Sequence, residues 1–154
     1  MTKAVSSREE FENNLKKAIE KRRDSVGEIN KMIGFDLESC DFDNRSAVFS
    51  HTTLEGELNF RKTMHGGIIC WLADTSMGTL SQAYAQTDNP TLDMDVNFIK
   101  PIFEGDKLLI KASINSVGGH IITSECKIFV ASGSEEILAA TSSGSFFRLD
   151  KDYK

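Results

Sequence analysis

A single carboxylate lies inside an apolar stretch of the sequence. Asp74 is flanked by Leu72, Ala73 and Met77, and apolar residues recur around it at helical spacing. An ionised carboxylate is costly in such surroundings unless the protein pairs it or uses it. Asp74 is therefore a candidate functional residue. An aspartate at the edge of the helix, bonded to a neighbouring element, would produce the same pattern.

Two glycines stand directly before this stretch, in the triplet His65, Gly66 and Gly67. Glycines allow the chain to turn sharply, and the first N–H groups of a helix point outward without a partner inside the helix. Such a terminus can stabilise a carbonyl oxygen that gains negative charge during acyl transfer. A plain turn with a helix cap would also explain a Gly-Gly pair, so the pattern alone leaves both interpretations open.

Motifs for other chemistries are missing from the sequence. There is no Gly-x-Ser-x-Gly elbow, no phosphate loop and no dinucleotide fingerprint. The histidines and cysteines also lack the spacing of a metal site, and these residues are His51, His65, His120, Cys40, Cys70 and Cys126. We therefore expect neither a metal nor a cofactor.

The composition is that of one globular domain with a single core, because the chain has 154 residues, 40% of them hydrophobic and 27% charged. The net charge of -5 argues against a nucleic-acid-binding protein, which would need a basic face. The first ten residues do not resemble a signal peptide, and no segment approaches the roughly 20 apolar residues that a membrane span needs. We expect a cytoplasmic protein that binds neither nucleic acid nor membrane.

The elements that would position these residues begin with an N-terminal helix. Ser7 and Glu10 form a capping-box pattern, and apolar residues then recur at helical spacing up to Ile19. We interpret the basic residues between 16 and 23 as the solvated face of this helix. A short second helix is predicted over residues 26–33.

The rest of the chain predicts strands around one long helix. Strand patterns occupy residues 34–51, an irregular loop covers 52–64, and a helix runs uninterrupted through Asp74 towards Pro90. Apolar and polar residues then alternate up to Phe147 in four strands joined by tight turns, which indicates an antiparallel meander.

A helix that is apolar on most faces must be enclosed, and one curled antiparallel sheet can enclose it. The predicted fold class is α+β, with one curled antiparallel β-sheet wrapped around a long central α-helix and an extra N-terminal helix. We expect residues 1–33 to be a helical extension and residues 34–154 to be the main domain, in one domain overall.

Asn59, the triplet His65-Gly66-Gly67, Asp74, the strand Leu92–Phe98 and Pro101 together resemble the hot-dog-fold thioesterases. The resemblance is closest to the phenylacetate-degradation type within the 4-hydroxybenzoyl-CoA thioesterase superfamily, and it covers roughly residues 34–149. It implies that the chain is an acyl-CoA thioesterase.

The resemblance also implies a role for each site residue. Asp74 would be the nucleophile or the general base towards water, and the Gly66 N–H would polarise the thioester carbonyl. Asn59 and His65 would help to place the thioester, and Thr91 would orient the water. A thioester is already activated, so these groups suffice without metal or cofactor.

The substrate would be held partly by basic residues. Arg61, Lys62 and Lys100 could meet the phosphates of coenzyme A, although they could equally be solvated surface charges. Gly67 would contribute to substrate binding beside Gly66 at the start of the helix.

Two alternatives remain at this point. A hot-dog hydratase or dehydratase would use a histidine base with a carboxylate on the helix, and His65 is present for that role. A non-catalytic acyl-CoA sensor could share the fold, although it would not need Asp74 and Asn59.

Helix geometry predicts that each active site draws on two chains. Asp74 follows Gly66 by eight residues, which corresponds to about 12 Å along a helix axis. Both groups must lie roughly 3 Å from one reacting carbonyl, so one chain cannot supply both. We expect a homodimer with two antiparallel helices and shared sites, and the resemblance implies joined sheets and further pairing into a homotetramer.

Overall fold

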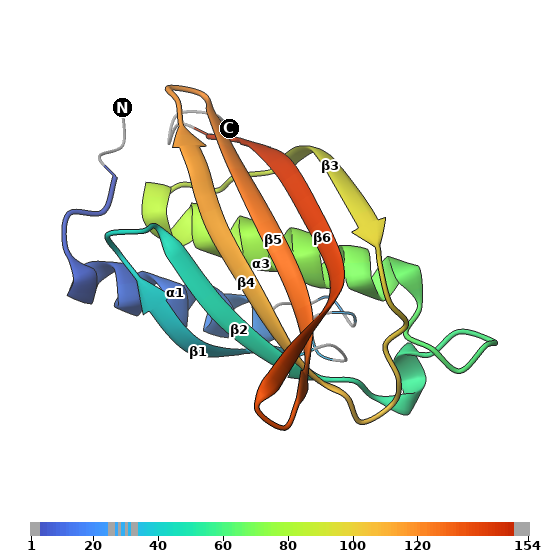
Figure 1. Ribbon diagram of the computed structural model, residues 1–154. Coiled ribbons are helices and arrows are strands. Elements are labelled where there is room, and N and C mark those ends of the chain that lie inside the picture. The colour runs from blue at the N-terminus through green and yellow to red at the C-terminus, as the bar shows by residue number, and fades with distance from the viewer. Residues whose placement is uncertain (1–3, 25–26, 28, 30, 32–33, 150–154) are drawn as a thin grey trace.

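Six antiparallel strands curve around one long helix, and a shorter helix packs beside it (Figure 1). The computed structural model describes residues 4–24, 27, 29, 31 and 34–149. In chain order the elements are α1 (Arg8–Arg23), β1 (Asp36–Asp41), β2 (Ser46–Thr52), the short 3-10 helix η1 (Glu55–Glu57), α3 (Gly66–Ala85), β3 (Thr91–Phe98), β4 (Lys107–Val117), β5 (Ile121–Ser132) and β6 (Glu135–Phe147).

The long helix α3 forms the centre of the fold, because most of its residues are small or apolar. From Leu72 to Ala85 nearly all of its residues are buried, and Met77 and Leu80 are completely so. The helix ends where Gln86 adopts a left-handed conformation with φ 55° and donates its N–H to the Gln82 carbonyl. The predicted central helix is confirmed.

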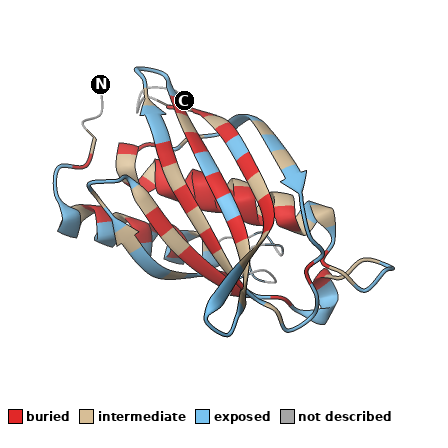
Figure 2. Cartoon of the chain, in the orientation of Figure 1, coloured by how far each residue is buried: buried red, intermediate tan, exposed pale blue. Residues whose placement is uncertain are grey.

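The sheet has the strand order β1-β2-β4-β5-β6-β3, and all neighbours are antiparallel. Alternate residues of the central strands are buried against α3, as the banding in Figure 2 shows. On β4, for example, Leu108, Ile110, Ala112 and Ile114 face the core. The predicted curled sheet around one helix is therefore confirmed. The predicted meander of four consecutive strands is wrong for β3, which pairs with β6 and not with β4, whereas β4, β5 and β6 do follow one another in the sheet. In the described sheet β1 and β3 are the two edges.

The N-terminal helix α1 begins at the predicted cap, since Ser7 Oγ accepts the Glu10 N–H at 3.2 Å. Its apolar face is part of the same core, with Phe11 and Leu15 fully buried. Phe11 also meets Tyr84 of α3 edge to face, at 6.1 Å between ring centroids. The short helix predicted over residues 26–33 lies largely outside the described residues.

The prediction that the basic run of α1 is solvated throughout is wrong for Arg22. Lys16, Lys17, Lys21 and Arg23 are exposed, whereas Arg22 is partly buried. Arg22 follows Leu15 by seven residues and Ala18 by four, so it shares the face of α1 that packs on α3. Its Nη1 donates to Gln82 Oε1 of α3 at 2.8 Å.

Candidate active site

The start of α3 is held by its own capping residue. His65 has the extended backbone of an N-cap, and its Nδ1 accepts the Gly67 N–H at 2.9 Å. The neutral His65 ring must then carry its proton on Nε2. The Gly66 N–H has no acceptor among the described residues. The two glycines therefore differ, and only Gly66 offers an unused N–H at the helix terminus.

Phe98 of β3 packs against Gly66. A Cβ atom at this position would lie 3.3 Å from Phe98 Cζ, which is tighter than nine in ten real Cβ contacts, so the ring would have to move slightly to admit it. Beside the ring, Gly66 lines a pocket of about 310 Å³. Asn59, Gly66, Phe98 and Lys100 all line this pocket. The structure thus brings together three of the predicted site residues, namely Asn59, Gly66 and Lys100.

Asn59 shapes the loop that leads to this pocket. Its Oδ1 accepts the Arg61 N–H at 2.8 Å, and its Nδ2 donates to Thr63 Oγ1 at 3.1 Å. The described residues use only one of the two amide hydrogens of Asn59. The loop turns Arg61 and Lys62 into solvent, where Arg61 lies over the ring of Phe60, at 5.4 Å from its centroid.

Asp74 lies at the other end of the candidate site, in the middle of α3. It is half-buried, and its Oδ1 accepts a hydrogen bond of 2.6 Å from Thr91 Oγ1. The Phe147 N–H donates to the Pro90 carbonyl, which fixes Thr91 at the start of β3. The second oxygen of Asp74 accepts no hydrogen bond from the described part of the chain. A water molecule could therefore bind there and lose its proton to the carboxylate.

Within one chain the two groups of residues are separate. Asn59, Gly66 and Lys100 gather at the N-terminal end of α3, whereas Asp74 and Thr91 meet eight residues further on. That step corresponds to about 12 Å along the helix. The first group offers an unused N–H at Gly66, and the second offers a carboxylate at Asp74. An acyl-transfer reaction needs a donor and a base or nucleophile of these two kinds.

A basic residue that the sequence analysis assigned to the solvated face lies near Asp74. Nη2 of Arg22 is 3.9 Å from the place where a Cβ on Gly78 would lie, and Gly78 is one helical turn from Asp74. Burial lowers the pKa of the Arg22 guanidinium, and the carboxylates of Asp74 and Asp88 act in the opposite direction. The side chain still carries its charge, since an arginine does not lose its proton in a protein.

A buried acid–base pair beneath the loop was also not predicted. His51 Nε2 lies 2.8 Å from Glu57 Oε2, and the two side chains are only 3% and 4% exposed. The other ring nitrogen, Nδ1, donates to the Gly34 carbonyl at 2.6 Å. The backbone carbonyl of Glu57 accepts the His65 N–H at 2.8 Å, so this pair supports the residue that caps α3.

No group of three or more histidine, cysteine, aspartate or glutamate side chains that could hold a metal occurs among the described residues. The cysteines are free, and burial raises the pKa of the Cys126 thiol to about 12. No helix in the described part of the chain is long and apolar enough to cross a membrane.

Comparison with known proteins identifies a family and several relatives of the chain. Residues 61–137 match the family model of the thioesterase superfamily. A relative from Archaeoglobus fulgidus, named as an inferred esterase, is 26% identical over 96 residues. That alignment covers 62% of this chain and 60% of the relative, so the chain matches less than two thirds of the relative's length.

Solved structures share the fold over most of the chain. The Escherichia coli PaaI protein from the phenylacetic acid degradation operon has a TM-score of 0.79 at 22% identity, covering 94% of this chain and 97% of its own. Zebrafish thioesterase superfamily member 2 has a TM-score of 0.76 at 17% identity, covering 89% and 97%. A Streptococcus mutans protein bound to acetyl-CoA has a TM-score of 0.68 at 24% identity, covering 77% and 90%. The hot-dog fold predicted from the sequence is confirmed.

Proposed function

The chain belongs to the thioesterase superfamily, and we propose that it hydrolyses acyl-CoA thioesters to a free acid and coenzyme A. One observation carries the proposal above the others. The same helix presents an unused N–H at Gly66 and a carboxylate at Asp74, the latter held by a hydroxyl at 2.6 Å. An oxyanion donor and a base or nucleophile are the two groups that thioester hydrolysis requires.

In the proposed reaction the thioester carbonyl points at the Gly66 N–H. As water or the carboxylate attacks the carbonyl carbon, negative charge moves onto the carbonyl oxygen, and the N–H stabilises it. Asp74 either removes a proton from the water or attacks directly, and Thr91 holds the carboxylate in place. The C–S bond then breaks. In the general-base route the acyl group leaves as the free acid, and the proton held by Asp74 passes to the thiolate of coenzyme A. In the nucleophilic route the acyl group stays on Asp74 as an anhydride, which water hydrolyses to the free acid, and the thiolate takes its proton from water.

The two halves of the site would come from two chains of a homodimer. β3 is an edge strand that pairs only with β6 in the described sheet, and its exposed apolar residues include Leu92 and Phe98. Joining two β3 edges about a two-fold axis would place the start of one β3 beside the end of the other. Thr91 with Asp74 of one chain would then approach Phe98 with Gly66 of its partner.

Coenzyme A would bind over the pocket beside Gly66. Lys100 lines that pocket, and Arg61 and Lys62 are exposed at the tip of the adjacent loop, where they could meet the phosphates. Asn59 and the Nε2–H of His65 would direct the thioester. The Gly67 N–H is occupied by the cap, so we assign Gly67 a role in the turn and none as a donor. We propose a cytoplasmic enzyme, paired further into a tetramer, that needs no cofactor.

The test is a panel of acyl-CoAs scored by release of free thiol. The wild type should release thiol from at least one of them, and Asp74→Asn, which preserves shape, should lose at least about a hundredfold in kcat. Binding of acyl-CoA without thiol release would instead indicate a sensor. Conversion of a 3-hydroxyacyl-CoA to its enoyl product would indicate a hydratase.

A further inference from the structure

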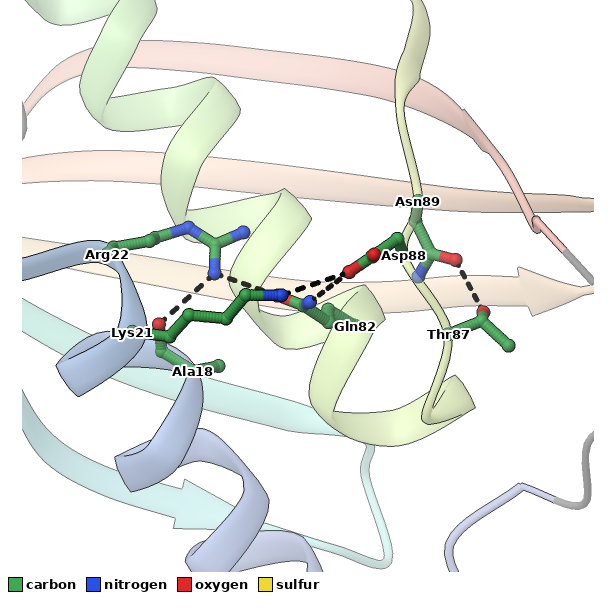
Figure 3. A network of polar contacts seen from close by, with 7 residues as sticks. All are labelled: Ala18, Lys21, Arg22, Gln82, Thr87, Asp88 and Asn89. Carbon is green, nitrogen blue, oxygen red and sulfur yellow. Dashed lines mark hydrogen bonds and ion pairs between the residues drawn. The ribbon is translucent and has the colours of Figure 1, made fainter. Parts of the chain in front are cut away.

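A polar network connects the N-terminal helix α1 to the central helix α3 (Figure 3). Arg22 of α1 donates through Nη1 to the Ala18 carbonyl at 3.2 Å and to Gln82 Oε1 at 2.8 Å. Gln82 in turn donates to Asp88 Oδ1 at 2.7 Å, and Lys21 forms an ion pair with the same oxygen at 3.5 Å. Two consecutive residues of α1 thus reach across to α3 and to the segment that follows it.

Arg22 of α1 packs against the face of α3 that carries Asp74. Asp74, Gly78 and Gln82 are spaced four residues apart, so they follow one another along one side of the helix. Gly78 has no side chain, and Nη2 of Arg22 occupies the space above it, 3.9 Å from where a Cβ would lie. The guanidinium therefore spans from Gln82 towards Asp74, about one helical turn away.

A fixed positive charge at this place would matter most when the site is closed. Asp74 is half-buried in the single chain, and a bound substrate and a partner chain would remove more water from it. Loss of water disfavours an ionised carboxylate, and a nearby guanidinium offsets that cost. Arg22 is partly buried, which weakens the screening of its charge by solvent.

A second set of contacts in the network holds the chain just before Thr91, whose hydroxyl group binds Asp74. Asp88 is held by Gln82 and Lys21, and its carbonyl accepts the Leu149 N–H at 3.1 Å. Asp88 stands three residues before Thr91, so its anchoring fixes the path by which the chain enters β3. Among the described residues, Lys21 and Asp88 are further charged groups of this network; both are exposed, and Asp88 contacts α1 and α3.

We infer that Arg22 is a positioning residue for the proposed thioesterase reaction, and that its charge keeps the Asp74 carboxylate in its reactive state. The inference rests on the proposed function, and it makes the N-terminal helix part of the catalytic unit. Neither the spacing of the sequence motif nor the match to the family, which begins at residue 61, includes this helix.

The kinetic test compares two substitutions at position 22. Arg22→Met keeps an apolar stem of similar length but removes the charge, and Arg22→Lys keeps the charge. We expect Arg22→Met to lower kcat about tenfold with KM changed less than about twofold, and Arg22→Lys to stay within about threefold of the wild type. Lys17→Met is the matched control, because Lys17 is exposed on the same helix. An Arg22→Met variant with wild-type kcat, or Arg22→Lys impaired as much as Arg22→Met, would overturn the inference.

A second measurement does not depend on turnover. The chemical denaturation midpoint is measured for Arg22→Met in the wild-type and in the Asp74→Asn background, with Arg22→Gln as the replacement if the methionine variant does not fold. If the two side chains interact, removing the charge shifts the midpoint less when Asp74 is already neutral. Equal shifts in both backgrounds would refute the inference even if no acyl-CoA is hydrolysed. Failure of the thiol-release panel with wild-type protein would refute the proposed function alone.

Discussion

Thr91 Oγ1 donates a hydrogen bond of 2.6 Å to Oδ1 of Asp74, and this contact ties the first residue of β3 to the middle of α3. The bond leaves the second carboxylate oxygen to face a water molecule or a substrate. It also fixes the rotamer of Asp74 by a strand that is itself held in register by β6. The proposed catalytic carboxylate is therefore oriented by sheet structure, not only by the helix that carries it.

We predict that Thr91→Val lowers kcat about tenfold with little effect on KM, because valine has the shape of threonine without the donor. Thr91→Ser should retain most of the activity, since it keeps the hydroxyl. Thr91 is exposed, so the thermal midpoint of both variants should stay close to that of the wild type. Steady-state kinetics and thermal unfolding check the prediction, and a fully active valine variant would show that the bond has no catalytic role.

Gly66→Ala should lower thioester hydrolysis strongly, because the new Cβ meets Phe98 Cζ at 3.3 Å. Either the phenylalanine ring moves and alters the pocket wall beside the N–H, or the start of α3 shifts and displaces the oxyanion donor. Complete loss of such a donor costs about a hundredfold to a thousandfold in kcat, which sets the upper limit of the expected effect. Gly56→Ala is the control, since its Cβ would have nothing within 4 Å. The prediction fails if Gly66→Ala and Gly56→Ala have the same kcat.

The sequence predicts those parts of the fold that follow from the spacing of apolar residues. The apolar run around Asp74 predicted α3, and the alternation after Pro90 predicted the sheet that encloses it. Arg22 is an exception, because its charge favours a solvated position whereas its spacing from Leu15 and Ala18 places it on the buried face. The lesson is that helical phase decides where a basic residue points.

The His51–Glu57 pair could not have been predicted in the same way. Its members come from β2 and η1, and their contact depends on how the loop after β2 folds back on the strand. His51 follows Ala47 and Phe49 on the buried face of β2, but Glu57 stands in no periodic pattern that marks it as buried. The difference between Gly66 and Gly67 is equally local, because it depends on the ring orientation of His65. Such details follow from tertiary geometry and not from sequence spacing.

Glu57→Gln should destabilise the fold although it preserves shape. Glu57 Oε2 accepts the Leu54 N–H at 3.0 Å and lies 2.8 Å from His51 Nε2. A glutamine oxygen could accept from both partners only if the His51 ring carries two protons, and it would then leave that buried cation without its counter-charge. With a neutral His51, the glutamine NH₂ would have to face Nε2, and the Leu54 N–H would lose its acceptor. A buried polar group left without a partner costs about 1–3 kcal/mol. Urea denaturation measures the free energy of unfolding, and Glu55→Gln, which is exposed on the same short helix, is the control. Equal stability of the two variants would contradict the assignment.

The last prediction is that two inactive variants restore activity in a mixed dimer. Asp74→Asn removes the carboxylate half of the site, and Asn59→Ala removes a residue from the Gly66 half. β3 begins at Thr91, which binds Asp74, and ends at Phe98, which packs on Gly66. If the β3 strands of two chains pair antiparallel, the Asp74 half of the site in one chain lies beside the Gly66 half in its partner.

Unfolding and refolding the two variants together should make about half of the dimers mixed, each with one intact site of two. Roughly a quarter of the wild-type activity should therefore return. Each variant refolded alone is the control and should stay inactive. The subunit exchange is checked by mass spectrometry with one variant isotopically labelled. If mixed dimers form and the activity stays at the level of the separate variants, each site is built from one chain, and the shared site must be abandoned.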